Sequence, residues 1–188
     1  MNKEVVNIIN DSQDFNYNLK DKKEVIINYY HKDQKDIKIS LIQNNDSKLT
    51  LNFFCYINED VKVYIDNIVT GNNNISNINV RAIACKNNGY FDVKIKALEK
   101  TKNNVLIEDI KGLNENGAII LKPVLEIDTK DIDAKHYATI GSFNFDELFY
   151  LASKGISFDE AKNIIKQSLV YGMFDNKFIK IIKDSKNE

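Results

Sequence analysis

The sequence predicts a mainly β protein, a solenoid of stacked strands followed by a small helical segment. Residues 1 to about 141 hold roughly ten short segments in which apolar and polar residues alternate, with no helical segment between them. Short clusters rich in Asn, Asp and Gly, such as KNNG and NENG, separate these segments and are typical of turns. After Gly141 the apolar spacing lengthens from two residues to that of a helix.

The strand segments alternate clearly. KLTLNFFCYI places Leu49, Leu51, Phe53 and Cys55 on one face. The same alternation continues in VKVYID, NINVRAIAC, YFDVKIKAL, NVLIEDIKG, GAIILKPVLEI and DIDAKHYATI. A sandwich, a barrel and a solenoid are all compatible with this pattern. The small or β-branched inward positions, and the scarcity of turn residues around Pro123, favour the solenoid, although no strict sequence repeat is present.

Residues 142–188 form the predicted helical segment, and residues 1–141 the β core. In SFNFDELFYLASKG, Asn144 is positioned to cap a helix and Gly155 to end it. A second helix starts at Ser157, with Glu160 three residues later, and a third amphipathic piece is NKFIKIIK. About 48 residues are too few to bury a core of their own, so this segment must pack on the strands or on a partner.

Composition excludes several classes of function. The chain has 188 residues, a formal net charge of −1 and a single arginine, Arg81, which argues against nucleic-acid binding. No apolar run approaches the roughly 20 residues needed to cross a membrane, and no secretory signal is recognisable. Two cysteines in such a chain fit a reduced, cytoplasmic protein. The many Asn, Lys and Ile residues are typical of an AT-rich genome and are not counted as functional signals.

Few residues are candidates for a catalytic or ligand-binding role. The chain has no phosphate-binding glycine loop, no Cys-x-x-Cys and no serine nucleophile motif. Asp131 and Asp133 share a strand face, where solvated carboxylates are the usual case. His31 lies in the polar stretch YYHKDQKD, which predicts an exposed loop histidine. Cys55 and Cys85 close the apolar sides of two strands and are expected to be buried, inert thiols.

His136 stands out. Alternation with Ile132 and Ala134 places it on the inward face of its strand. A buried imidazole needs a partner for its ring nitrogens, either a protein group or a metal. A structural histidine with a protein partner is the more common of these two cases.

Residues 122–170 resemble the C-terminal part of the SufB/SufD family of iron–sulphur cluster assembly proteins. The resemblance lies in the order and spacing of short motifs, which are Lys122–Pro123, Leu125–Glu126–Ile127, Asp131, Lys135–His136, Ala138–Thr139–Ile140–Gly141, Leu148–Phe149–Tyr150–Leu151, Ser153–Lys154–Gly155–Ile156 and Glu160–Ala161. Residues 112–121, GLNENGAIIL, also resemble the preceding turn of the family's solenoid.

The resemblance implies a right-handed parallel β-helix and a scaffold subunit, not an enzyme. It implies that the C-terminal helices bind a SufC-type ABC ATPase, and the corresponding positions here are Tyr150, Leu151, Gly155, Ile156 and Phe158. It also implies contact with a SufB-like subunit or a second copy.

The histidine at the position of His136 lies at that interface in the family, where a transient iron–sulphur cluster is proposed to form. Cys85 is the other candidate metal ligand in this chain. No tightly bound cofactor, nucleic acid or membrane is expected.

The chain also departs from the family pattern. Cluster-building SufB members have a Glu directly after the histidine and a Cys about one solenoid turn earlier. Here Tyr137 follows His136, and no Cys occurs after Cys85, which favours a SufD-like partner subunit. A β-helix interaction module without a cluster role is the main alternative. A β-helix enzyme acting on carbohydrate is less favoured, because the chain has no Trp and no secretion signal.

Overall fold

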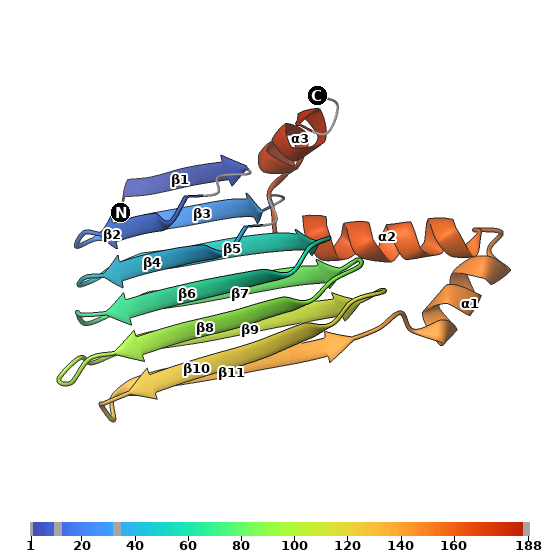
Figure 1. Cartoon of the computed structure of the whole chain (residues 1–188). Coiled ribbons are helices and arrows are strands. Elements are labelled where there is room, and N and C mark those ends of the chain that lie inside the picture. Colours follow the sequence, from blue (N-terminus) through green and yellow to red (C-terminus); the bar gives the residue numbers. More distant parts are fainter. Residues whose placement is uncertain (1, 10–12, 32–34, 186–188) are drawn as a thin grey trace.

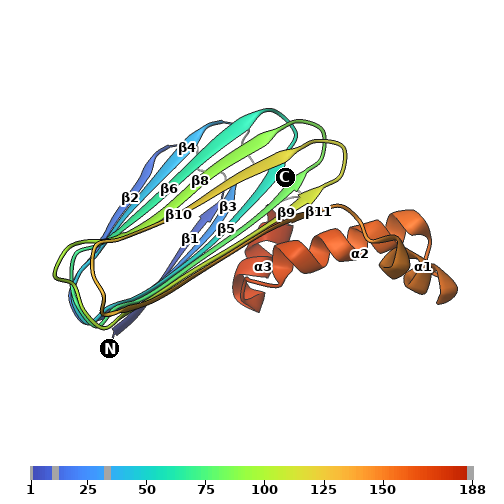
Figure 2. The same ribbon diagram turned by 90° about the horizontal axis from the view of Figure 1, so that it is seen from below.

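The computed structural model describes residues 2–9, 13–31 and 35–185, which form a two-sheet parallel solenoid followed by three helices (Figures 1 and 2). The elements are β1 (Asn2–Ile9), β2 (Phe15–Leu19), β3 (Lys23–His31), β4 (Ile37–Gln43), β5 (Lys48–Ile57), β6 (Val61–Val69), β7 (Ile75–Ala84), β8 (Gly89–Ala97), β9 (Asn104–Asn114), β10 (Ile119–Ile127), β11 (Ile132–Gly141), α1 (Phe145–Ser153), α2 (Phe158–Tyr171) and α3 (Asn176–Asp184).

Successive strands alternate between the two sheets. The odd-numbered strands form one sheet in the order β1-β3-β5-β7-β9-β11, called sheet A here, and the even-numbered strands form sheet B in the order β10-β8-β6-β4-β2. Neighbouring strands are parallel in both sheets. The predicted solenoid is therefore confirmed. Pro123 lies in the edge strand β10, where a residue without an N–H is tolerated.

The turns of the solenoid differ in length, which explains why the sequence shows no strict repeat. A ladder of stacked asparagines on the outer face of sheet A shows this directly. Asn28 lies 21 residues after its partner Asn7, Asn52 lies 24 after Asn28, and Asn79 lies 27 after Asn52. The side chains nevertheless stay in register, and each Nδ2 donates to the Oδ1 of the previous asparagine at 2.9–3.0 Å.

Side-chain hydrogen bonds also connect the turns that lie between the strands. Asp21 accepts a hydrogen bond from the backbone N–H of Asn45 at 2.9 Å, and Asn45 accepts one from Asn72 at 2.9 Å. Asn72 in turn accepts one from Lys102 at 2.8 Å. The abundant asparagines, which composition alone did not distinguish from genomic bias, therefore satisfy backbone and side-chain groups between successive turns.

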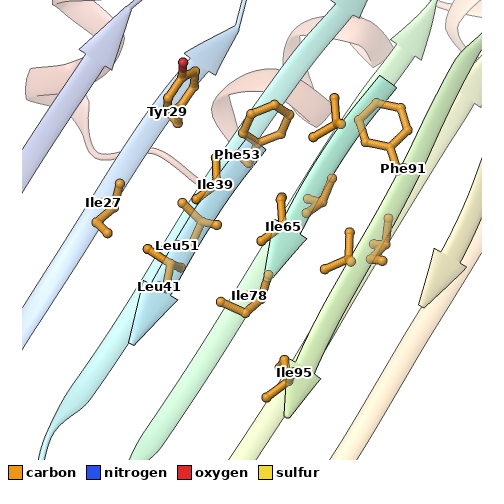
Figure 3. Close-up of a cluster of buried hydrophobic side chains, with 14 of the residues drawn as sticks. Ile27, Tyr29, Ile39, Leu41, Leu51, Phe53, Ile65, Ile78, Phe91 and Ile95 are labelled. Carbon is orange, nitrogen blue, oxygen red and sulfur yellow. The ribbon is translucent and has the colours of Figure 1, made fainter. Parts of the chain in front are cut away.

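The core lies between the two sheets and consists of columns of stacked apolar side chains (Figure 3). One column runs through Ile27, Leu51 and Ile78, which are direct register partners and fully buried. In the next, the rings of Tyr29 and Phe53 lie 5.3 Å apart. Cys55 is buried among these residues as predicted, and burial raises the pKa of its thiol.

The prediction for His31 was wrong. His31 ends β3 and is fully buried, with its ring 6.0 Å from that of Phe53 and 6.1 Å from that of Tyr29. Its Nε2 lies 3.0 Å from the backbone oxygen of Lys35. The polar residues after position 31 suggested a turn, but β3 continues through Tyr29 and His31, and the alternation of the strand directs both rings into the core.

The end of α2, α3 and the residues between them pack on the outer face of sheet A (Figure 2). The buried residues of this second cluster are Tyr30, Phe54, Ile83 and Leu113 from four consecutive strands of sheet A, and Val170, Phe174, Phe178 and Ile182 from the helical segment. Lys166 of α2 donates to the carboxylate of Glu115 at 2.8 Å. The helical segment thus leans on the strands, as its size required. Among residues 145–185, no helix has the length and apolarity that a membrane span requires.

The helix ends follow the predicted signals. The Asn144 side chain accepts a hydrogen bond from the N–H of Asp146, and that of Ser157 accepts one from Glu160. Gly155 has φ of 85° just after α1, a conformation that favours glycine. The change from strand to helix falls between Gly141 and Phe145.

The asparagine ladder predicts a measurable stability effect. Asn52→Ala leaves a donor on Asn79 and an acceptor on the buried Asn28 without partners, which costs about 1–3 kcal/mol. We expect the free energy of unfolding in urea to fall by about 2 kcal/mol. Asn16→Ala, in the exposed face of β2, is the matched control and should change it by less than about 0.5 kcal/mol. Equal effects of the two substitutions would contradict a stabilising ladder.

Candidate functional site

His136 lies on the last strand of sheet A, at the open C-terminal end of the solenoid. Its register partner is Glu108 of β9, and two residues earlier Ala134 pairs with the buried Leu106. Because register partners in a parallel sheet point to the same side, His136 lies on the inward face, as predicted. It is nevertheless exposed, since no later strand of the described chain stacks on β11.

Glu108 occupies an apolar column of the core, directly before His136. Through successive register pairs the column runs Val6, Ile27, Leu51, Ile78, Glu108, His136. The Glu108 side chain is fully buried, and neither carboxylate oxygen has a hydrogen-bond partner among the described residues. The column therefore changes from aliphatic to ionisable in its last two turns.

The environment of Glu108 favours its protonated form. Burial, and secondly the negative charge of Asp92, raise its pKa to about 8. Asp92 lies on β8 and is itself bound by Lys122 at 2.7 Å and by the Tyr90 hydroxyl at 3.3 Å. Glu108 is not among the site residues predicted from the sequence. The signal was present in NVLIEDIKG, where alternation places one acidic residue between the inward Leu106 and Ile110.

Cys85 is not brought to His136. It follows Ala84, whose β9 partner Asn114 lies six residues beyond Glu108, roughly 20 Å further along the strand. The half-buried Cys85 thiol lies instead near the pair formed by Glu115 and Lys166. Burial, and secondly the carboxylate of Glu115, raise the pKa of this thiol. Stacking thus places a carboxylate, and no thiolate, beside His136.

The other acidic candidates are solvated. Asp131 and Asp133 are exposed, and Asp133 forms a surface ion pair with Lys135 at 3.3 Å. Within the described residues, no group of three or more His, Cys, Asp or Glu side chains could hold a metal ion. A metal site at His136 would therefore need donors from outside the described chain.

An open groove of about 920 Å³ separates α1 and α2 from the ends of the last strands of sheet A. Its walls are mainly apolar, with Tyr150 and Leu151 of α1 on the helical side. Arg81 and Lys111 line the strand side, where Arg81 also donates to the backbone oxygen of Asp109 at 2.7 Å. Two of the five residues predicted to bind an ATPase therefore line this groove.

The other three predicted contact residues, Gly155, Ile156 and Phe158, lie in the turn after α1 and at the start of α2, next to exposed aromatic side chains of α1. Phe145, Phe149 and Tyr150 are 73%, 63% and 64% exposed. Phe158, at the start of α2, is 44% exposed and packs edge-on against Phe149, with ring centroids 5.7 Å apart. Gly155 and Ile156 form the turn between the two helices. Part of the aromatic surface of the helices thus packs on the solenoid, and part remains accessible.

Comparison with known proteins places this arrangement in a family. Residues 42–169 match the family described as SUF system FeS cluster assembly, SufBD core domain. The match includes Glu108, His136 and most of α2. In addition, 82 residues are 32% identical to the iron-sulfur cluster assembly protein SufD of Escherichia coli (strain K12). That alignment covers 42% of this chain and 18% of the relative, so the chain spans less than a fifth of the relative's length.

Glu108 predicts a pH-dependent stability. Between about pH 4.5 and pH 8 the unfolded chain has released the proton of Glu108, whereas the folded chain retains it. The contribution of this group to stability is therefore complete below pH 4.5 and is lost as pH rises to 8. We expect the fall in unfolding free energy between pH 5 and pH 9 to be about 3 kcal/mol smaller in Glu108→Gln than in the natural protein.

The measurement is urea unfolding at pH 5, 7 and 9. Glu99→Gln is the control, because Glu99 is exposed on the turn after β8 and its loss should leave the pH dependence unchanged. The same pH dependence in all three proteins would show that Glu108 ionises freely in the folded state.

Proposed function

The chain belongs to the SufBD core family of SUF-system iron–sulphur cluster assembly proteins, and from this premise we propose that it is a SufD-like scaffold subunit, acting in the cytoplasm. In this role it binds a SufC-type ABC ATPase through its helical segment and a second SufB- or SufD-type subunit through the end of its solenoid. It binds and positions other components, and performs no catalysis of its own.

The observation that carries the ATPase contact is the accessible aromatic surface of α1. Side chains that stay exposed after α2 and α3 have packed on sheet A include Phe145, Phe149 and Tyr150. Clusters of exposed aromatic residues are typical of protein-binding sites, where Tyr and Phe supply much of the binding energy. The neighbouring groove adds Leu151, so a partner helix or loop has an apolar surface flanked by a cavity.

The observation that supports a subunit contact is the open strand edge at β11. β11 is the last strand of sheet A and β10 the last of sheet B, so each has one edge without a strand partner in the described chain. Such edges favour pairing with another chain. The exposed apolar residues Tyr137 and Ile140 of β11 add side-chain contacts to this surface.

His136 lies at this proposed subunit contact. It lies on the inward face of β11, uncovered within the described chain, where a subunit stacked on the end of the solenoid would contact it. We propose that a nascent cluster is held transiently at this seam as cargo, with thiolate ligands supplied by the partner. The presence of Tyr137 where cluster-building members have a Glu supports the partner-type assignment.

The ATPase contact is tested by co-purification with the cognate SufC-type ATPase. Phe149→Ala combined with Tyr150→Ala should weaken ATPase binding at least tenfold, because both rings are largely exposed in the free chain and are available to a partner. Tyr64→Ala, which removes an exposed ring from sheet B, is the matched control and should leave binding unchanged. Undiminished binding by the double variant would place the ATPase contact elsewhere.

The subunit contact is tested by light scattering, on the chain alone and mixed with a SufB-type partner. Ile140→Lys places a charge on the edge strand β11 and should convert the dimer or heterodimer to monomers, because burying an unpaired charge at an interface is costly. Ile42→Lys introduces the same charge on the exposed side of β4 and should have no effect. Assembly that survives Ile140→Lys would argue against β11 as the contact.

A further inference from the structure

Glu108 is a fully buried polar residue to which the described part of the chain offers no hydrogen-bond partner. Gln43, Asn67 and Asn74 each leave one buried amide atom without a partner, but each bonds through the other atom. Glu108 bonds through neither of its oxygens within the described residues. Leaving a buried polar group unpaired costs about 1–3 kcal/mol, and an aliphatic residue would continue its column at no such cost.

The position of Glu108 relative to His136 suggests a use. The two residues are register partners on adjacent strands, which lie about 4.8 Å apart, and both face inward. Glu108 is fully buried, whereas His136 on the last turn is exposed. A carboxylate and an imidazole therefore lie one behind the other, at the one end of the solenoid where a partner is proposed to dock.

We propose that Glu108 and His136 form a two-donor half-site for a divalent transition metal, Fe²⁺ in the assembly reaction, which the docked subunit completes. The inference rests on the proposed function and adds Glu108 to it. A carboxylate oxygen and an imidazole nitrogen are a suitable donor pair for Fe²⁺, and also for Co²⁺ and Zn²⁺. The remaining ligands come from the partner, since no third donor side chain joins this pair within the described residues.

Binding exchanges a proton for the metal and changes no oxidation state. The Glu108 carboxyl releases its proton to solvent as the oxygen coordinates the ion, and His136 coordinates through a neutral ring nitrogen. Coordination gives the buried carboxylate a bonding partner, which it lacks within the described chain. Because Glu108 is fixed in the core, it also fixes where along β11 the ion is held.

The probe is Co²⁺, added to the full chain and followed by its visible absorption and by paramagnetic broadening of backbone NMR signals. We expect broadening centred on residues 106–110 and 134–138, without the intense absorption of a cobalt–thiolate bond. Glu108→Gln and His136→Gln should each weaken binding at least about tenfold, since even outer-shell partners of metal ligands contribute about 10-fold. Glu99→Gln should bind as the natural protein does.

Two further measurements keep the outcomes distinct. Glu108→Leu extends the apolar column, so it should remain folded and still lose Co²⁺, which separates loss of a ligand from loss of structure. Co²⁺ binding that is unchanged in Glu108→Gln, or broadening centred on Asp131 and Asp133, overturns the half-site. Co-purification of the natural chain with the ATPase, run in parallel, tests the proposed function independently. ATPase binding without a Glu108-dependent Co²⁺ site refutes only the half-site, and a Glu108-dependent Co²⁺ site without ATPase binding refutes only the ATPase role.

Discussion

The whole structure depends on parallel, in-register stacking of turns of unequal length. Each side chain lies on the side chain at the same position in the previous turn, so every position along a strand becomes a column through the molecule. Side chains of the same kind within one column provide favourable contacts for one another. Aliphatic residues exclude water, as Ile27, Leu51 and Ile78 do, and asparagines bond to asparagines, as Asn28 and Asn52 do. A turn can gain or lose residues without disturbing the columns, provided that the added residues lie between the strands.

A stacked structure of this kind has two ends, and the chemistry of an end differs from that of the interior. In the interior a polar inward residue must find a partner in the next turn. At the C-terminal end no later turn of the described chain stacks on His136, and Glu108 lies one turn earlier. Both residues occupy inward positions whose counterparts in the earlier turns are aliphatic. A site built there is open to a docking subunit, and the rigid core beneath it fixes the position of its ligands.

The helical segment packs across the solenoid and also leaves aromatic side chains exposed. Its second half lies across several turns of sheet A, where Phe174 and Phe178 pack on residues of successive strands and tie them together. Its first half, α1, makes less use of its aromatic side chains in packing, and Phe145 and Phe149 remain accessible. The same short segment therefore reinforces the stack and presents a surface close to the open end.

The sequence by itself determined that residues up to Gly141 form strands and that helices follow, and it placed the bounds of β5 to β11 to within a few residues. Period-two alternation, the spacing after Gly141 and the capping residues Asn144 and Ser157 are local signals, readable without knowledge of the fold. It also indicated the inward direction of His136. Only the tertiary structure decided which turns stack, because the register between strands depends on contacts 21 to 30 residues apart. That register separated Cys85 from His136 and placed Glu108 beside it, neither of which a local pattern encodes.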